Sequence, residues 1–227
     1  MVDSGMNNRA LRRELVDVAR AMNSTGLNQG TSGNLSLRIK GGLLVTPSSL
    51  PYEQMEMEDL VATDFCGHPL GSELAVRDRR PSSEWRLHAD VLADRPDAMA
   101  VFHCHPVHAT ALACHDRGIP PFHYMTAVAG GDDIRCAPYA TFGTAELSAN
   151  TVRALRDRQA CLLGHHGLVS LGRDLDQALK IAVEVETLAE MYLQALQLGE
   201  PPLLSRTQME EVHMQFRGLG YGQTPKD

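Results

Sequence analysis

Two histidines separated by a single residue form the most informative pattern of this sequence. His103 and His105 lie in Val101-Phe102-His103-Cys104-His105, after an apolar run and before Pro106, which predicts a short strand that ends at a loop. Because side chains alternate between the two faces of a strand, both imidazoles would point to the same side, one pleat apart. This geometry suits two ligands of one metal ion, while Cys104 would face the opposite side as a small buried residue.

A third imidazole is available well downstream. The run Leu162-Leu163-Gly164 ends in His165-His166-Gly167, and since adjacent residues face opposite ways, we expect only one of these two histidines to bind. Three neutral imidazoles around a divalent ion that keeps an open position are typical of a catalytic zinc site. Mn2+ and Co2+ accept the same ligands. A purely structural zinc site, or histidines that only form hydrogen bonds in the core, are the alternatives.

The other histidines are expected to lie outside this site. We interpret four of them as structural residues, with His108 also able to approach the site from the next helix, and two as solvated. The structural group is His88, His108, His115 and His123, and the solvated pair is His68 and His213.

Three short segments rich in hydroxyl groups could hold an anion. Ser82 and Ser83 precede an apolar segment with helical spacing, and the hydroxyls and backbone amides at a helix start favour an anion, particularly phosphate. Glu84 would then lie between that anion and the metal. Gly30-Thr31-Ser32-Gly33-Asn34 and Thr46-Pro47-Ser48-Ser49 offer similar groups on flexible backbone. An ordinary helix cap and plain turns are the structural alternatives.

The elements that must position these residues alternate between strand and helix patterns. Apolar spacing predicts a helix through residues 11–22, and alternation predicts a hairpin of strands 35–39 and 43–45. Further helices are expected after Ser82 or Ser83, over 145–158 and over 175–198, with strands at 161–163 and 168–171 and a loop at 130–138. The pattern predicts an α/β fold with a largely antiparallel sheet and helices on its faces.

Composition limits the class of protein. At 227 residues with 43% apolar residues, one compact domain spanning 1–227 is expected. The formal charge of −7, without a stretch rich in lysine or arginine, argues against a nucleic-acid partner. The sequence starts without a signal-peptide pattern and has no apolar stretch long enough for a membrane span. Five cysteines without paired spacing favour a reducing compartment, and we expect a cytoplasmic protein.

Taken together, these motifs resemble the class II aldolase/adducin family, and most closely its fuculose-phosphate aldolase branch. The matching segments follow one another along nearly the whole chain: Gly30-Thr31-Ser32-Gly33-Asn34-Leu35-Ser36, Thr46-Pro47-Ser48, Pro81-Ser82-Ser83-Glu84-Trp85, His103-Cys104-His105-Pro106-Val107-His108, His123-Tyr124-Met125, Ala137-Pro138-Tyr139-Ala140-Thr141-Phe142-Gly143-Thr144 and His165-His166-Gly167-Leu168.

The resemblance implies a three-layer α/β fold and a role for each site residue. It implies one zinc ion held by His103, His105 and His166, with Glu84 at the metal as the acid/base. It implies that substrate phosphate rests on Asn34, Ser48, Ser82 and Ser83, with Thr31 and Gly33 shaping the loop. Tyr124 matches a proton donor supplied by a neighbouring subunit, Phe142 matches an aromatic residue on the aldehyde side, and the family suggests a homotetramer with active sites at subunit interfaces.

Two positions depart from that branch. Ser49 stands where glycine is usual, and its amide can still donate to phosphate provided that the turn does not require a positive φ. In the relatives a tyrosine follows a phenylalanine of the C-terminal tail, whereas here Tyr221 fits after Phe216 only with a slip of two residues. We expect the tail, about 217–227, to be mobile.

The resemblance implies a metal-dependent aldolase that cleaves a ketose 1-phosphate into dihydroxyacetone phosphate and an aldehyde. L-Fuculose 1-phosphate and a 5-deoxy- or 5-methylthioribulose 1-phosphate are the candidate substrates. A pentulose-phosphate 4-epimerase or a methylthioribulose-phosphate dehydratase of the same family is the alternative. A non-catalytic adducin-like interaction module is disfavoured by the complete histidine set and Glu84.

Overall fold

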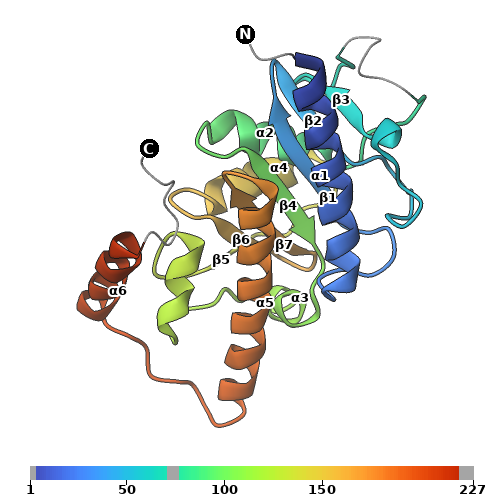
Figure 1. Cartoon of the computed structure of the whole chain (residues 1–227). Helices are drawn as coiled ribbons and strands as arrows, with labels where there is room; N and C mark the ends of the chain where they lie inside the picture. The colour runs from blue at the N-terminus through green and yellow to red at the C-terminus, as the bar shows by residue number, and fades with distance from the viewer. Residues whose placement is uncertain (1–3, 71–76, 220–227) are drawn as a thin grey trace.

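A single mixed sheet forms the centre of the computed structural model, which describes residues 4–70 and 77–219 (Figure 1). Its seven strands lie in the order β3-β2-β1-β4-β7-β6-β5, and every neighbouring pair is antiparallel except β5 and β6. The strands are β1 (Asn34–Ile39), β2 (Gly42–Val45), β3 (Val61–Thr63), β4 (Ala100–Cys104), β5 (Arg135–Ala137), β6 (Ala160–Leu163) and β7 (Gly167–Gly172). The prediction of an α/β fold with a mainly antiparallel sheet is therefore confirmed.

Helices cover both faces of the sheet. In Figure 1, α1 (Ser4–Ser24) and α5 (Leu175–Leu196) lie in front of it, and α2 (Trp85–Asp94) and α4 (Ala145–Ala154) lie behind it. The short helix α3 (Val107–Ala113) packs on the side of α5. Each helical layer encloses its own cluster of buried apolar side chains, so the core has two parts separated by the sheet.

Strand β4 shows how the sheet sorts its side chains. Ala100, Phe102 and Cys104 point into the cluster under α1 and α5, while Val101 points into the cluster under α2 and α4. His103 therefore lies on the side of α2, and Cys104 faces away from it as the alternation predicts. Burial raises the pKa of the Cys104 thiol well above its ordinary value, which suits a small core residue rather than a ligand.

Most of the expected elements are present, with different ends. The hairpin of β1 and β2 is confirmed, but the helix expected over 145–158 ends at Ala154 and the helix expected over 175–198 ends at Leu196. The loop expected at 130–138 is wrong for Arg135–Ala137, which form β5 beside β6. Strand β4 ends at Cys104, so His105 is the first residue after it.

Four elements have no counterpart among the predictions: β3, the 3-10 helices η1 (Met57–Asp59) and η2 (Tyr124–Ala129), and α6 (Arg206–Gly218). Helix α6 begins with a capping box of Ser205 and Gln208, and its first twelve residues bury only Met209, so its apolar pattern is weak. Residues 217 and 218, where the tail expected to be mobile begins, complete this helix, and 220–227 lie outside the described residues. No helix in the described ranges is long and apolar enough to span a membrane.

Candidate functional site

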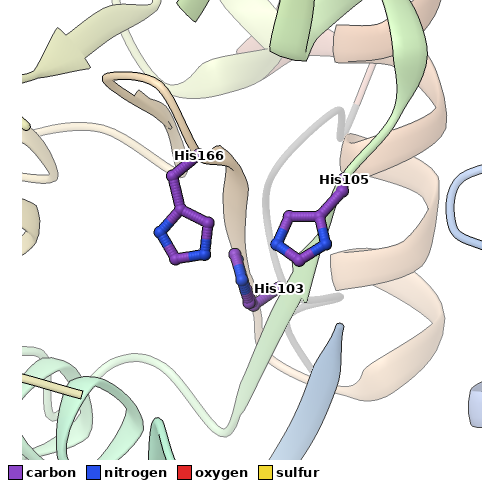
Figure 2. A group of neighbouring side chains, drawn as sticks. All are labelled: His103, His105 and His166. Atoms are coloured by element: carbon purple, nitrogen blue, oxygen red, sulfur yellow. The ribbon is translucent and has the colours of Figure 1, made fainter. Parts of the chain in front are cut away.

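Three imidazoles converge where β4 ends and the β6–β7 turn begins. Figure 2 shows the rings of His103, His105 and His166 facing a common point, and their possible ligand nitrogens all lie within 4.8 Å of one another. The ring centroids are 4.7, 4.8 and 5.1 Å apart. Antiparallel pairing of β4 with β7 sets His103 opposite Val169 and so brings the turn that precedes β7 beside the end of β4. Residues more than 60 positions apart thus form one cluster.

The β6–β7 turn selects between its two histidines. His166 points inward, whereas His165 has φ 53°, a side chain that is 51% exposed, and an Nε2 atom 3.7 Å from the Asp116 carboxylate. A positive φ at His165 turns its side chain away from that of its neighbour. Only His166 of this pair therefore joins the cluster, although His165 also lines the cavity described below.

The hydrogen bonds of His103 define which of its nitrogens is free. Nδ1 lies 2.9 Å from the Leu168 carbonyl oxygen, which can only accept, so Nδ1 carries the proton and Nε2 presents a lone pair. His103 Nε2, His105 Nε2 and Glu84 Oε1 are all buried without a hydrogen-bond partner in the part of the chain that the structure describes. Buried lone pairs left without a donor are unfavourable. A divalent cation would satisfy them, and a backbone carbonyl behind a histidine ligand is the usual arrangement in metal sites.

Glu84 brings a carboxylate to the same point. Its Oε2 lies 3.2 Å from His103 Nε2 and accepts a hydrogen bond of 2.9 Å from Asn34 Nδ2, and its Oε1 lies 3.5 Å from His166 Nε2. Burial raises the pKa of Glu84, but His103, His166 and the Asn34 amide lower it by more than burial raises it. The net pKa is below the ordinary value, so the carboxyl is ionised.

The two remaining imidazoles of the cluster are neutral. Burial lowers the pKa of His105 to about 3 and that of His166 to about 4. Neutral imidazoles beside an ionised carboxylate form a donor set suited to Zn2+ and to other divalent transition metals.

The histidine cluster opens into a cavity of about 360 Å³. All three hydroxyl-rich segments of the sequence line it, as do Tyr139, Ala140 and Phe142. Of the predicted phosphate and substrate residues, the cavity brings together Thr31, Gly33, Asn34, Ser48, Ser49, Ser82, Ser83 and Phe142. The cavity therefore joins short polar side chains and backbone amides to the candidate metal cluster, and aromatic side chains lie at its exposed edge.

Backbone contacts hold the polar loops beside one another. Pro47 bridges Pro81, Ser48 N–H donates to the Arg80 carbonyl, and Ser82 N–H donates to the Thr46 carbonyl. Gly33 is required by space, because a Cβ there would lie 2.8 Å from the His103 carbonyl oxygen and φ is +30°. The loop before β1 thus lies directly against the strand that carries the histidines.

The start of α2 differs from the expected cap. Neither Ser82 nor Ser83 is the N-cap residue; that position is held by Glu84, whose side chain makes no capping bond. Ser82 Oγ instead accepts from the Glu84 N–H at 3.3 Å. The alternative of an ordinary serine cap is therefore not found, and the Glu84 side chain is directed toward His103 and Asn34 instead of its own helix end.

The condition placed on Ser49 is not met, because its φ is 58°. This left-handed conformation is one that glycine adopts without strain and serine does not. Ser49 lines the cavity nonetheless.

Tyr124 is not among the residues that line this cavity. Tyr124 begins η2, is 50% exposed, and its ring stacks edge-on against Phe216 at 6.5 Å. Tyr221 lies outside the described residues. His108 turns away from the cluster and bonds Glu186 at 2.8 Å. His213 is not solvated as expected, since it bonds Asp132 at 2.8 Å with a side chain only 23% exposed.

The sequence predicts no site role for Tyr139 and keeps His165 only as the alternative to His166. His88, expected to be structural, is fully buried and bonds Asn34 and Ser36. Its position four residues after Glu84, the N-cap residue of α2, is the sequence signal that it lies near the site. Tyr139 and His165 line the cavity from loops, and the spacing of apolar residues does not predict the backbone conformation of a loop.

Comparison with known proteins places these features in context. The family model described as the Class II Aldolase and Adducin N-terminal domain matches residues 13–193. A 5-methylthioribulose-1-phosphate/5-deoxyribulose-1-phosphate aldolase of Rhodospirillum rubrum is 51% identical over 211 residues, covering 93% of each chain. The L-fuculose phosphate aldolase of Escherichia coli K12 is 45% identical over 216 residues, covering 95% of this chain and 98% of that one. A solved L-fuculose 1-phosphate aldolase has a TM-score of 0.86 at 36% identity, covering 96% of this chain and 98% of that chain.

We expect the protein to bind one divalent ion per chain. His105→Ala should lower the metal content severalfold, because the site then loses one of its three nitrogen ligands. Elemental analysis after dialysis measures it. The exposed His115 is the matched control, and His115→Ala should retain the metal. Full occupancy in His105→Ala would remove His105 from the ligand set.

Ser49→Gly should raise the free energy of unfolding by about 0.5–1 kcal/mol, because relief of roughly 1–2 kcal/mol of left-handed strain exceeds the entropy cost of glycine. Urea unfolding of the metal-free protein measures this difference. Ser83→Gly is the control, since Ser83 lies on the same cavity without a positive φ and should lose stability instead. Equal losses in both variants would show that Ser49 is unstrained.

Proposed function

The chain belongs to the class II aldolase and adducin family, and from that membership we propose that it is a metal-dependent aldolase acting on a ketose 1-phosphate. The observation that carries the proposal is the buried set of lone pairs on His103, His105 and Glu84 at the base of a hydroxyl-lined cavity. Reversible cleavage of the bond between C3 and C4, the carbons α and β to the ketone, would give dihydroxyacetone phosphate and an aldehyde.

The proposed metal ligands are His103, His105 and His166, with Glu84 as a further ligand before substrate enters. Zn2+ is the expected ion, and Mn2+ or Co2+ fit the same donors. A divalent cation held there supplies a Lewis acid that stabilises negative charge developing beside the carbonyl carbon. The protein itself supplies fixed imidazoles: the Leu168 carbonyl orients His103 through Nδ1.

Glu84 is the proposed acid/base. Its Oε2 is held by Asn34, whereas its Oε1 has no hydrogen-bond partner among the described residues and is therefore the oxygen available to a proton. That atom would take and return the proton at the nucleophilic carbon of dihydroxyacetone phosphate. Among the described residues no lysine is placed for a Schiff-base route, because neither Lys40 nor Lys180 lines the cavity.

Phosphate binding is assigned to the three polar loops. Ser48, Ser82 and Ser83 present hydroxyls to the cavity, and the backbone of Thr31, Gly33 and Ser49 shapes the same wall. Holding the phosphate away from the reacting carbons fixes the orientation of the ketone. Phe142, exposed at the edge of the cavity, is assigned to the aldehyde end.

Completion of the site by a second subunit is part of the proposal. Tyr124 would protonate the aldehyde oxygen in a neighbouring active site of a homotetramer, and its half-exposed ring outside its own cavity supports this assignment. Tyr221 is proposed to help close the site. A cytoplasmic location rests on the spacing of the cysteines.

The substrate is proposed from the relatives' names. The relative at 51% identity is named for 5-methylthioribulose 1-phosphate and 5-deoxyribulose 1-phosphate, and those at 45% for L-fuculose phosphate. These ketose phosphates share the ketone and the 1-phosphate and differ at the aldehyde tail. We therefore place the two ribulose derivatives first and L-fuculose 1-phosphate second.

The proposal is tested by measuring aldehyde release from 5-methylthioribulose 1-phosphate, 5-deoxyribulose 1-phosphate and L-fuculose 1-phosphate on protein of known metal content. We expect cleavage that a chelator abolishes and Zn2+ restores, with the relative kcat/KM ranking the substrates. Metal-loaded protein that cleaves none of the three, but epimerises a pentulose phosphate or eliminates water from the methylthio substrate, would replace the aldolase assignment with that activity.

Glu84→Gln should keep the metal and lower kcat by roughly 10²–10⁴-fold, the range of a lost general base. Steady-state kinetics together with metal analysis measure both quantities on one sample. Glu146, an acidic residue in the first turn of α4, provides the control, and Glu146→Gln should behave like wild type. Near-normal turnover in Glu84→Gln would exclude Glu84 as the base.

A further inference from the structure

A line of buried hydrogen bonds runs from β1 through α2 to Glu84. Ser36 Oγ lies 2.8 Å from His88 Nδ1, His88 Nε2 lies 2.5 Å from Asn34 Oδ1, and Asn34 Nδ2 lies 2.9 Å from Glu84 Oε2. Ser36 and His88 are fully buried, and Asn34 and Glu84 are nearly so. His88 is absent from the cavity wall, so it reaches the proposed chemistry only through Asn34.

The Glu84 carboxylate, at the end of this line, determines which group donates and which accepts in each hydrogen bond. An ionised carboxylate can only accept, so the Asn34 group facing Glu84 must be the NH2 group. The amide oxygen of Asn34 then faces His88 Nε2, which must donate and therefore carries a proton. In a neutral ring Nδ1 is then the acceptor, and Ser36 supplies its hydroxyl proton. Burial lowers the pKa of His88 to about 3, in agreement with a neutral ring.

The Glu84 carboxylate selects one of the two orientations of the Asn34 amide, and the Nε2–H of His88 stabilises that orientation. With the amide turned over, the Asn34 oxygen would face the carboxylate, and His88 could accept from the Asn34 NH2 group only with its proton moved to Nδ1, where Ser36 Oγ would accept it. Two buried oxygens facing each other without a proton between them are costly. The observed orientation leaves Oε2 held by an N–H and Oε1 without a hydrogen bond among the described residues.

We propose that His88 is a positioning residue, which through its Nε2–H fixes the Asn34 amide and so aims Oε1 of Glu84 at the substrate. This inference rests on the proposed role of Glu84 as the acid/base. Asn34, the opposite neighbour of His103 across β1 and β4, thus links the histidine strand, the polar loop and the carboxylate.

The first test does not depend on activity. The tautomer of His88 can be measured by NMR on protein with ¹⁵N-labelled histidine, in which the His88 signals are those lost in His88→Gln. We expect a neutral ring with the proton on Nε2, and the same tautomer in the metal-free and the metal-loaded protein. A neutral Nδ1–H tautomer or an imidazolium would overturn the proposal. This outcome can be read even if the protein cleaves no ketose phosphate, so failure of the proposed function is distinguished from failure of this inference.

The second test separates positioning from support of the fold. His88→Leu should lower kcat by about 10- to 100-fold with normal metal content, as misplacement of a catalytic group does, whereas His88→Gln keeps an N–H donor and should recover most of the loss. Asn34→Asp, which presents no donor to Glu84, should lower kcat similarly, and the double variant His88→Leu/Asn34→Asp should lose little more than either single one.

Ser170→Ala is the matched control, because Ser170 is a fully buried hydroxyl of the same sheet that bonds the Ala178 carbonyl and does not reach Glu84. It should lose stability and keep kcat. Two results would show that His88 only supports the fold. One is a kcat that falls in proportion to the loss of thermal stability in both the Ser170 and the His88 variants. The other is a loss of kcat in the double variant equal to the product of the losses in His88→Leu and Asn34→Asp. Should His88→Leu fail to fold, His88→Gln and the tautomer measurement still decide.

Discussion

The register of β4 between β1 and β7 is the constraint on which the site depends. Pairing sets Asn34 opposite His103 on one side and Val169 opposite His103 on the other. A slip of one residue would turn His103 into the apolar cluster under α5 and bring Cys104 to the site, because side chains alternate strictly along a strand. The buried apolar residues of β4, Val101 and Phe102, oppose that slip from both faces of the sheet.

That constraint explains which features could be predicted from the sequence. The spacing of His103 and His105 and the hydroxyl-rich loops are local patterns that predicted a metal cluster and an anion site, the alternation in the hairpin predicted an antiparallel sheet, and the family resemblance supplied the remaining cavity residues, such as Phe142. The choice of His166 over His165 depends on a positive φ in a tight turn. No local pattern specifies such a turn for histidine, so spacing left both candidates open and only the family resemblance named His166.

The features that were missed depend on contacts between distant segments. β5 is three residues long and exists because it pairs with β6, about 25 residues further along the chain. His88 lies in a sequence context typical of an ordinary core residue. Its proposed positioning role depends on a hydrogen bond to Asn34, which lies on another element 54 positions away. Helix α6 is mostly exposed and carries little apolar signal. In each case the deciding partner lies far along the sequence, where periodicity carries no information.

The close approach of Gly33 to the backbone of His103 has a mechanical consequence. A loop whose Cα leaves no room for a methyl group against the neighbouring strand cannot slide or hinge independently of it. The hydroxyl-lined wall and the histidine wall therefore behave as one stiff half of the cavity. Any adjustment of the cavity to ligands of different length must then come from the opposite rim, where Tyr139 and Phe142 are more than half exposed. With the aldehyde end proposed at Phe142, tolerance for different sugar tails would be confined to this rim.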